Sequence, residues 1–240
     1  MTLARAEGRA AFSVSLMCMD LMDAGRQIET LNGLADAYHI DIMDGHFTKN
    51  LALSPDFARA VSRYATLPLD IHLMVDTPMD WLEQFAGRPD TTLSVHAETI
   101  GNNAFRVLDR VRALGCRTGV AINPATPFEQ ISAYLNRVDL LTIMTVDVGY
   151  SGAPFLPEVL PKIERAAQFK AENGLGYTIQ IDGSCNKRSY RSLTQAGAEM
   201  FVLGNTGLFG LAEDLGQAWR QLDAEYEAAT AVATEGEGAA

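Results

Sequence analysis

The sequence predicts a single-domain α/β protein, a (β/α)8 barrel of the TIM type. Eight short apolar runs, rich in β-branched residues, alternate with longer amphipathic stretches over about 215 residues, which is the spacing of eight strand–helix units. The structural alternative is a doubly wound open sheet, which usually has fewer strands and a glycine-rich turn after its first strand. The chain instead reads SLMCMDLMD at that point, with no glycine. The barrel is therefore the expected fold.

Each expected element follows from its local pattern. Pro55 and Pro157 suit a first helical turn, and Gly115, Gly174 and Gly197 suit helix ends. The expected strands cover residues 12–17, 37–42, 69–75, 92–96, 118–122, 140–146, 177–181 and 200–203. Helices are expected between them, among others at 24–34, 55–64, 103–114, 157–173 and 187–196.

The two ends of the chain differ in composition from its middle. We expect an N-terminal extension at 1–11, one barrel domain at 12–222 and an acidic, disordered tail at 223–240. The last segment is rich in small residues and poor in large apolar ones, and such chains do not bury enough surface to fold. It also holds five acidic residues and no basic one: Asp223, Glu225, Glu227, Glu235 and Glu237.

The net charge of −11 excludes several classes of partner. Nucleic-acid binding depends on clustered Lys and Arg, and so does electrostatic attachment to a membrane surface, so neither partner is expected. Three cysteines, Cys18, Cys116 and Cys185, form no CxxC pair and no disulfide framework. With no signal peptide and no transmembrane run in the sequence, a cytoplasmic protein is expected.

Polar side chains gather at the carboxyl ends of three expected strands, where barrel enzymes carry their chemistry. His39 and Asp41 share one strand face, His72 lies on the next strand, and Asp182 follows the seventh. A single inward His is often an ordinary hydrogen-bonded core residue. Four buried ionisable groups at one end of the barrel need a common cation to offset their desolvation. Two imidazoles and two carboxylates suit Zn²⁺, Mn²⁺ or Fe²⁺.

Three methionines lie at matching depth on these strands: Met43, Met74 and Met144. Methionine is ordinary core filler, but here these side chains also suit a water-excluding lining beside an electron-rich intermediate.

Glycine-rich turns follow the sixth, seventh and eighth expected strands. Their backbone N–H groups can bind a phosphate without basic side chains, and barrel phosphate sites commonly use the loops after strands seven and eight. The residues concerned are Gly149, Tyr150, Ser151 and Gly152, then Gly183 and Ser184, and finally Gly204, Asn205 and Thr206.

A cation beside two carboxylates, with a phosphate anchor at the same end, predicts proton transfer next to a carbonyl group. Two opposed carboxylates indicate an epimerase. Two other classes stay open. A phosphate-binding decarboxylase of this fold needs a lysine among aspartates, which the segment Asp41-Ile42-Met43-Asp44 does not contain. A non-catalytic phosphosugar sensor needs neither the acid pair nor the metal.

The segments SVSLMCMD, HIDIMDGHFTKN, DIHLMV, MTVDVGYSGAPF, IDGSCN and GNTGLF resemble the motifs of the ribulose-phosphate 3-epimerase family. The match spans roughly residues 12–219. SLMCMDL, IDGSCN and GNTGLF resemble the allulose-6-phosphate 3-epimerase branch more than the pentose enzymes. The resemblance thus implies D-allulose 6-phosphate and D-fructose 6-phosphate as the preferred pair, with D-ribulose 5-phosphate and D-xylulose 5-phosphate as the alternative.

The resemblance also implies residue roles. Asp41 and Asp182 are the acid/base pair, and they bind one divalent ion per subunit (Zn²⁺, Mn²⁺, Fe²⁺, Co²⁺ or Mg²⁺) together with His39 and His72. A homo-oligomer acting on a small sugar phosphate is expected. The substrate is contacted by Ser15, Met43, His72, Met74 and Met144 and by the glycine-rich turns named above.

Four positions fall outside this assignment. The family usually has proline where this chain has Val14 and Val148, and the loss of a fixed φ should loosen the second loop. His46 lies in a segment similar to the family's lid and suits a substrate-side role. His96 has no role in the motif and is expected to be structural.

Overall fold

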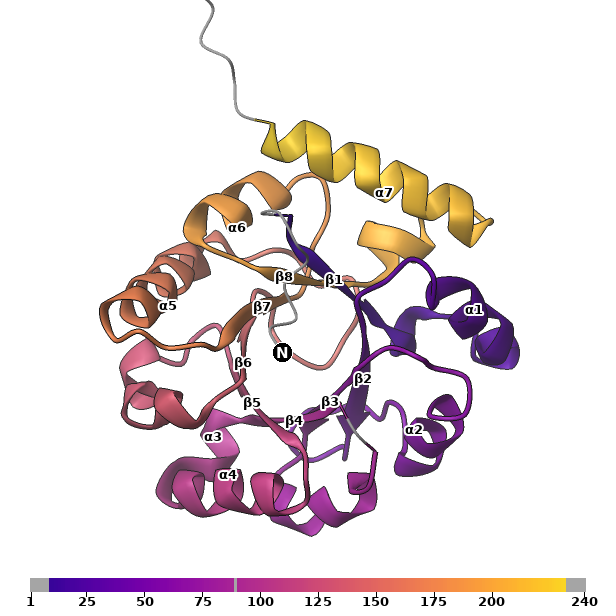
Figure 1. Ribbon diagram of the computed structural model, residues 1–240. Helices are drawn as coiled ribbons and strands as arrows, with labels where there is room; N and C mark the ends of the chain where they lie inside the picture. The colour runs from indigo at the N-terminus through magenta and orange to yellow at the C-terminus, as the bar shows by residue number, and fades with distance from the viewer. Residues whose placement is uncertain (1–8, 89, 232–240) are drawn as a thin grey trace, which may run out of the picture.

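The computed structural model describes residues 9–88 and 90–231, and its eight strands close into a barrel. Every strand pairs in parallel with its neighbours in chain order, and β1 closes the ring by pairing with β8 (Figure 1). The predicted (β/α)8 fold is therefore confirmed. The strands are β1 (Ala11–Ser15), β2 (Ala37–Met43), β3 (Leu69–Met74), β4 (Thr91–His96), β5 (Arg117–Ile122), β6 (Leu140–Met144), β7 (Thr178–Asp182) and β8 (Met200–Leu203).

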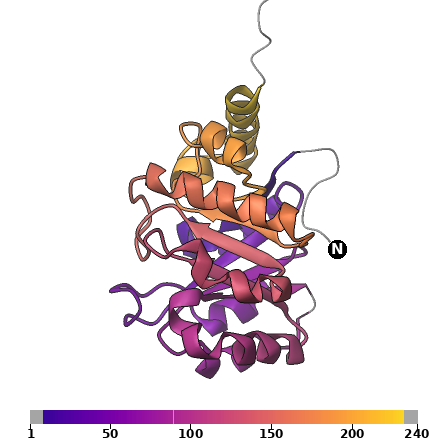
Figure 2. The same ribbon diagram turned by 90° about the vertical axis from the view of Figure 1, so that its left-hand side faces the viewer.

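Helices form the outer layer around the strands (Figures 1 and 2). After β3 and β5 the connections are short 3-10 turns, η3 (Pro78–Asp80) and η4 (Leu82–Phe85), then η6 (Phe128–Gln130) and η7 (Ser132–Arg137). The α-helices are α1 (Ala24–Leu31), α2 (Pro55–Val61), α3 (Ala97–Ile100), α4 (Ala104–Ala113), α5 (Leu160–Glu172), α6 (Tyr190–Ala196) and α7 (Leu215–Thr230).

Helix ends lie where local chemistry places them. Ser54 caps α2, because its hydroxyl oxygen accepts the N–H of Phe57 at 3.2 Å and Pro55 supplies the first helical residue. Helix α6 ends at Gly197, whose φ of 106° is a left-handed conformation that glycine adopts without strain. Helix α5 starts later than expected, because Pro157 begins a separate 3-10 turn, η8 (Pro157–Val159).

The last helix extends beyond the boundary that the composition predicts. Residues 223–230, expected to belong to the tail, continue α7, where Tyr226 is buried against the barrel. An amphipathic face one turn beyond Leu222 explains this continuation. Ala11, expected in the N-terminal extension, is the first residue of β1. The remaining expectations for residues 1–8 and 232–240 lie outside the described residues.

Alternation along the strands separates two buried regions. On β2, Tyr38, Ile40 and Ile42 face the helices and belong to the large apolar core. The intervening positions face the barrel interior. Its N-terminal end is filled by a small apolar cluster of Ala11, Ala37, Leu140 and Met200, each the first residue of its strand. Polar side chains thus occupy the interior toward the C-terminal ends.

No helix in the described part of the chain is long and apolar enough to cross a membrane.

Candidate functional site

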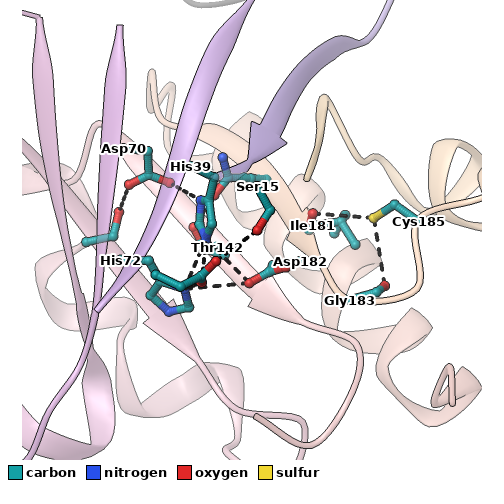
Figure 3. A network of polar contacts seen from close by, with 12 residues as sticks. Ser15, His39, Asp70, His72, Thr142, Ile181, Asp182, Gly183 and Cys185 are labelled. Atoms are coloured by element: carbon teal, nitrogen blue, oxygen red, sulfur yellow. Dashed lines mark hydrogen bonds and ion pairs between the residues drawn. The ribbon is translucent and has the colours of Figure 1, made fainter. Parts of the chain in front are cut away.

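Four of the predicted site residues meet inside the barrel at the C-terminal ends of three strands. His39 and Asp41 come from β2, His72 from β3 and Asp182 from the last position of β7. Figure 3 shows His39, His72 and Asp182 close together. The parallel register explains part of this convergence, because Asp41 stands beside His72. One ligand atom from each of the four residues lies within 4.8 Å of all the others. We call these residues the four-residue cluster.

Two ring nitrogens and two carboxylate oxygens face one small space in this cluster. Nε2 of His39 lies 3.3 Å from Oδ1 of Asp41 and 3.6 Å from Oδ2 of Asp182. Nδ1 of His72 lies 3.4 Å and 3.5 Å from the same two oxygens. The two ring nitrogens are 3.1 Å apart. Two imidazole nitrogens and two carboxylate oxygens are the kind and number of ligands that a first-row divalent cation takes, and all four face the same space.

Other side chains fix the orientation of the cluster from outside. Ser15 Oγ donates to the second oxygen of Asp41, Oδ2, at 2.9 Å. On the far side of the His39 ring, Nδ1 lies 2.9 Å from Oδ2 of Asp70. The other oxygen of Asp70 accepts the hydroxyl of Ser94 at 2.5 Å. A carboxylate behind an imidazole is the usual arrangement around a metal-binding histidine.

Burial and charge shift the pKa values of the cluster. Burial lowers the pKa of His39, but the carboxylates of Asp41, Asp70 and Asp182 outweigh it and raise that pKa well above its usual value. Burial raises the pKa of Asp41, but the imidazoles of His39 and His72 outweigh it and hold that pKa well below its usual value. Asp41 is therefore ionised, and positive charge is favoured on the histidine side of it. A cation would satisfy the same electrostatic demand.

Asp70 was not predicted to belong to the site, and His96 was expected to be structural. His96 contacts His72 directly, with their Nε2 atoms 2.9 Å apart, and its Nδ1 lies 3.1 Å from Oε2 of Glu98. Burial lowers the pKa of His96 to about 4. Burial raises the pKa of Glu98, but hydrogen bonds from His96 and Thr126 outweigh it and bring that pKa to about 2. Asp70 could have been predicted from the sequence, because residues two apart on a strand share a face and Asp70 therefore lies on the same face of β3 as His72.

A cleft opens above the cluster at the C-terminal end of the barrel. Asp41 and Asp182 reach its wall, whereas His39 and His72 are fully buried. No Lys or Arg is found among the described residues that line it. The predicted residues that do so are Ser15, Met43, Met74, Met144, Gly149, Tyr150, Ser151, Gly152, Gly183, Ser184, Gly204, Asn205 and Thr206. Met17, Cys18, Val146, Val148, Ala153, Cys185 and Val202 also line the cleft and were not predicted to.

Backbone conformation at one side of the cleft requires glycine. Gly183 has a φ of 115°, and a Cβ there would lie 2.7 Å from Cγ2 of Val146. Ser184 adopts the left-handed region as well, with a φ of 49°, and donates its hydroxyl to the carbonyl of Ala153 at 2.7 Å. This turn therefore presents main chain, with no bulky side chain, to the cleft.

Two loops meet at the mouth of the cleft. Asn50 donates its side-chain amide to the carbonyl of Gly149 at 2.7 Å, and Tyr150 donates its hydroxyl to the carbonyl of Lys49 at 2.8 Å. The loop after β2 is thus tied to the loop after β6 across the opening. His46 lies in the first of these loops but is exposed and does not line the cleft.

Comparison with known proteins finds relatives over most of the chain. Residues 11–209 match the model of the ribulose-phosphate 3 epimerase family. The chain is 36% identical over 193 residues to a protein of Bacillus subtilis named ribulose-phosphate 3-epimerase, covering 80% of this chain and 88% of that one. A Synechocystis protein of the same name is 34% identical over 193 residues, covering 80% and 84% of the two chains. One of Helicobacter pylori is 34% identical over 191 residues, covering 80% and 87%.

Solved structures with a similar backbone are much less similar in sequence. A mutant tryptophan synthase α-subunit of Pyrococcus furiosus superimposes with a TM-score of 0.62 at 14% identity, covering 90% of this chain and 96% of that one. A thiamine phosphate pyrophosphorylase of Pyrococcus furiosus gives a TM-score of 0.54 at 13% identity, covering 93% and 98%. At these identities the likeness concerns the fold alone.

Proposed function

The chain belongs to the ribulose-phosphate 3-epimerase family, isomerases that act on carbohydrate phosphates, and we propose that it interconverts D-ribulose 5-phosphate and D-xylulose 5-phosphate. The observation that carries the proposal is the pair of carboxylates, Asp41 and Asp182, that reach one cleft from two strands. The curated relatives compared above are named for the five-carbon reaction. They support the pentose substrate over the hexose substrate that the sequence motifs favour.

The proposed reaction begins with the proton on C3, next to the C2 carbonyl of the ketose. Asp41 is the base on one face of C3, because its oxygen is ionised, buried and oriented by the hydroxyl of Ser15. Asp182 delivers a proton to the opposite face. Its side chain is 17% exposed against 5% for Asp41, so the two carboxylates meet the cleft differently. In the reverse direction the two residues exchange roles.

A divalent cation held by His39, Asp41, His72 and Asp182 would polarise the carbonyl and the neighbouring hydroxyl and stabilise negative charge on their oxygens. The mixed imidazole and carboxylate donors support Zn²⁺, Mn²⁺, Fe²⁺ or Co²⁺ as much as Mg²⁺, and the donor set alone does not choose among them. Met43, Met74 and Met144 are buried beside this position. They exclude water, which would otherwise protonate the carbanion on either face.

The phosphate end of the substrate is proposed to lie against the glycine-rich turns. Gly183 and Ser184 contribute main-chain N–H groups from the turn after β7. Further donors come from the turn after β6 at 149–152 and from residues 204–206 after β8. Because no basic side chain lines the cleft in the described chain, the anchor depends on N–H dipoles. This geometry suits a dianion in a protein whose net charge is −11.

A second candidate is the six-carbon pair, D-allulose 6-phosphate and D-fructose 6-phosphate. The observation in its favour is the segment IDGSCN, in which Ser184 and Cys185 line the cleft beside Asp182. The same acid pair and phosphate turns would serve a ketose with one more carbon.

A side-by-side assay tests the assignment. The purified protein is loaded with each of several divalent ions and given D-ribulose 5-phosphate and D-allulose 6-phosphate in parallel. The proposal expects a higher kcat/KM for the five-carbon substrate. A higher value for the six-carbon substrate would reverse the order of the two candidates, and no turnover of either would reject both.

A further inference from the structure

A line of hydrogen bonds leaves the four-residue cluster through β4, and the proposed reaction does not use it. From Nε2 of His72 it passes to Nε2 of His96 at 2.9 Å, and from Nδ1 of His96 to Oε2 of Glu98 at 3.1 Å. The two rings are stacked, with centroids 5.0 Å apart and planes inclined by 21°. Both imidazoles are fully buried and Glu98 is 24% exposed. The line therefore runs from a buried site toward the surface.

The outer end of this line has fixed donors and acceptors. Oε1 of Glu98 accepts the backbone N–H of Asn123 at 2.9 Å and also the hydroxyl of Thr126. A backbone N–H can only donate, so Glu98 is held as an acceptor, the role of an ionised carboxylate. The hydrogen bonds to Glu98 also bring its pKa to about 2, so the carboxylate is ionised at neutral pH and its other oxygen, Oε2, accepts the proton that Nδ1 of His96 carries.

Each tautomer follows from the one before it. With its proton on Nδ1, neutral His96 has a lone pair on Nε2, which can only accept. His72 must therefore donate from its own Nε2. The remaining nitrogen of that ring, Nδ1, is left with a lone pair, and it is the nitrogen that faces Asp41 and Asp182.

The other histidine of the cluster, His39, has its tautomer set by a direct contact with a carboxylate, that of Asp70. Asp70 accepts from Ser94 through Oδ1 and from Nδ1 of His39 through Oδ2, so a neutral His39, the form that binds a cation, has its lone pair on Nε2. The cluster thus receives Nε2 from one ring and Nδ1 from the other. A direct carboxylate orients His39, whereas His72 is oriented through an intervening imidazole.

We propose that Glu98 and His96 are positioning residues that hold His72 in its Nε2–H tautomer and so present its Nδ1 lone pair to the cation. The inference rests on the proposed function, because it requires a divalent ion at the four-residue cluster. Outer partners of this kind orient the ligand and raise its basicity, and their loss typically weakens metal binding about 10- to 100-fold.

The substitution Glu98→Gln is the sharpest test. Gln has nearly the same shape as Glu, but it reverses the donor and acceptor roles along the line of hydrogen bonds. The new amide keeps its oxygen toward Asn123 and Thr126 and turns its NH₂ toward His96. Nδ1 of His96 then accepts and its Nε2 donates. His72 in turn accepts at Nε2 and carries its proton on Nδ1, where the cation should bind.

The matched control is Glu199→Gln. Glu199 also accepts a backbone N–H, that of Ile179 at 2.8 Å, and pairs with Lys170, but it does not belong to the four-residue cluster or line the cleft. It tests whether the loss of any partly buried carboxylate disturbs cation binding.

Two readouts are needed, neither of which is turnover. Competition with a chelator measures the dissociation constant for Zn²⁺ in substrate-free protein, and we expect it to rise about 10- to 100-fold in Glu98→Gln and to stay unchanged in Glu199→Gln. Long-range ¹H–¹⁵N spectra report the His72 tautomer, expected as Nε2–H in the unaltered protein and as Nδ1–H in Glu98→Gln. Raising free Zn²⁺ should restore site occupancy in the variant.

The outcomes separate this inference from the proposed function. If the unaltered protein binds Zn²⁺ and epimerises its substrate while Glu98→Gln binds equally tightly, the inference is wrong and the function stands. If the unaltered protein binds no divalent ion, the cation site itself fails. An Nδ1–H tautomer of His72 in the unaltered protein overturns the inference even if the variant does not fold.

Discussion

Asp41 and Asp182 belong to strands that are not neighbours in the barrel, yet each places a carboxylate oxygen within 3.6 Å of the same atom, Nε2 of His39. Two carboxylates this close to one point repel each other unless positive charge lies between them. A cation at this position would explain why Asp41 near the end of β2 and Asp182 at the end of β7 both point into the barrel. The same convergence brings to one cleft the two carboxylates that we propose as the acid/base pair.

Replacing Asp182 by asparagine should abolish most turnover while leaving sugar-phosphate binding largely intact. The amide has nearly the same shape but cannot accept and return a proton, and the loss of one general acid/base group typically costs about 10²- to 10⁴-fold in rate. Steady-state kinetics and direct binding of the substrate measure the two effects separately. Asp109→Asn, at a surface ion pair with Arg137, is the control. Unchanged turnover in Asp182→Asn would remove the two-base mechanism.

Two serines on β1 offer a matched pair of substitutions. Ser15 donates to Asp41, whereas the hydroxyl oxygen of Ser13 is buried with no hydrogen-bond partner among the described residues. Ser15→Ala should lower the free energy of unfolding by about 1.5–3 kcal/mol, the range for a hydrogen bond to a charged group, and should also lower kcat. Ser13→Ala should change neither. Denaturant titrations and kinetics of both variants check this, and equal effects would mean that Ser15 has no special role.

Glu98 should make stability depend on pH in acid. Its pKa falls from 4.5 to about 2 in the folded protein, so its ionised form stabilises the fold above pH 4.5, and this contribution is lost as the pH falls toward about 2. The free energy of unfolding of the unaltered protein should therefore decline more steeply over that window than that of Glu98→Gln. Denaturant titrations at several acidic pH values measure the slopes. Parallel slopes for the two proteins would show that Glu98 is not the group responsible.

The turn after β7 should not tolerate a side chain at Gly183. Its φ of 115° and the 2.7 Å approach of Val146 predict a cost of at least about 1–3 kcal/mol in Gly183→Ala, the range for a strained backbone position. Affinity for inorganic phosphate should fall as well, because the turn carries the proposed anchor. Gly176→Ala is the control, since no atom lies within 4 Å of its added Cβ and its φ is not left-handed. Thermal unfolding and phosphate titration of both variants decide this.

The alternation of apolar and polar residues was sufficient to predict the barrel and the four-residue cluster. His39, Asp41 and Met43 share a face on β2 whatever the neighbouring strands do, and the carboxyl end of a barrel strand places them at the cleft. The end of the barrel domain was placed too early, at residue 222, because the burial of Tyr226 against the barrel, which extends α7, depends on tertiary contacts.

The partners of the cluster could not be read from the sequence for a different reason. Which residues of β4 stand beside His72 depends on the register of two strands that are separated by a long connection. The pairing of His72 with Ser94, and the position of His96 beyond it, emerge only when the barrel closes. The choice between five-carbon and six-carbon substrates depended on short motif differences, and the curated relatives support the other substrate.

The fate of the hydrogen on C3 tests the central claim most directly. The protein, loaded with a divalent ion in D₂O, is given D-ribulose 5-phosphate, and NMR follows C3 of the product. The account predicts D-xylulose 5-phosphate that carries deuterium at C3, because one carboxylate removes the original proton and the other returns a solvent-derived one. Product that retains the original C3 hydrogen would contradict it.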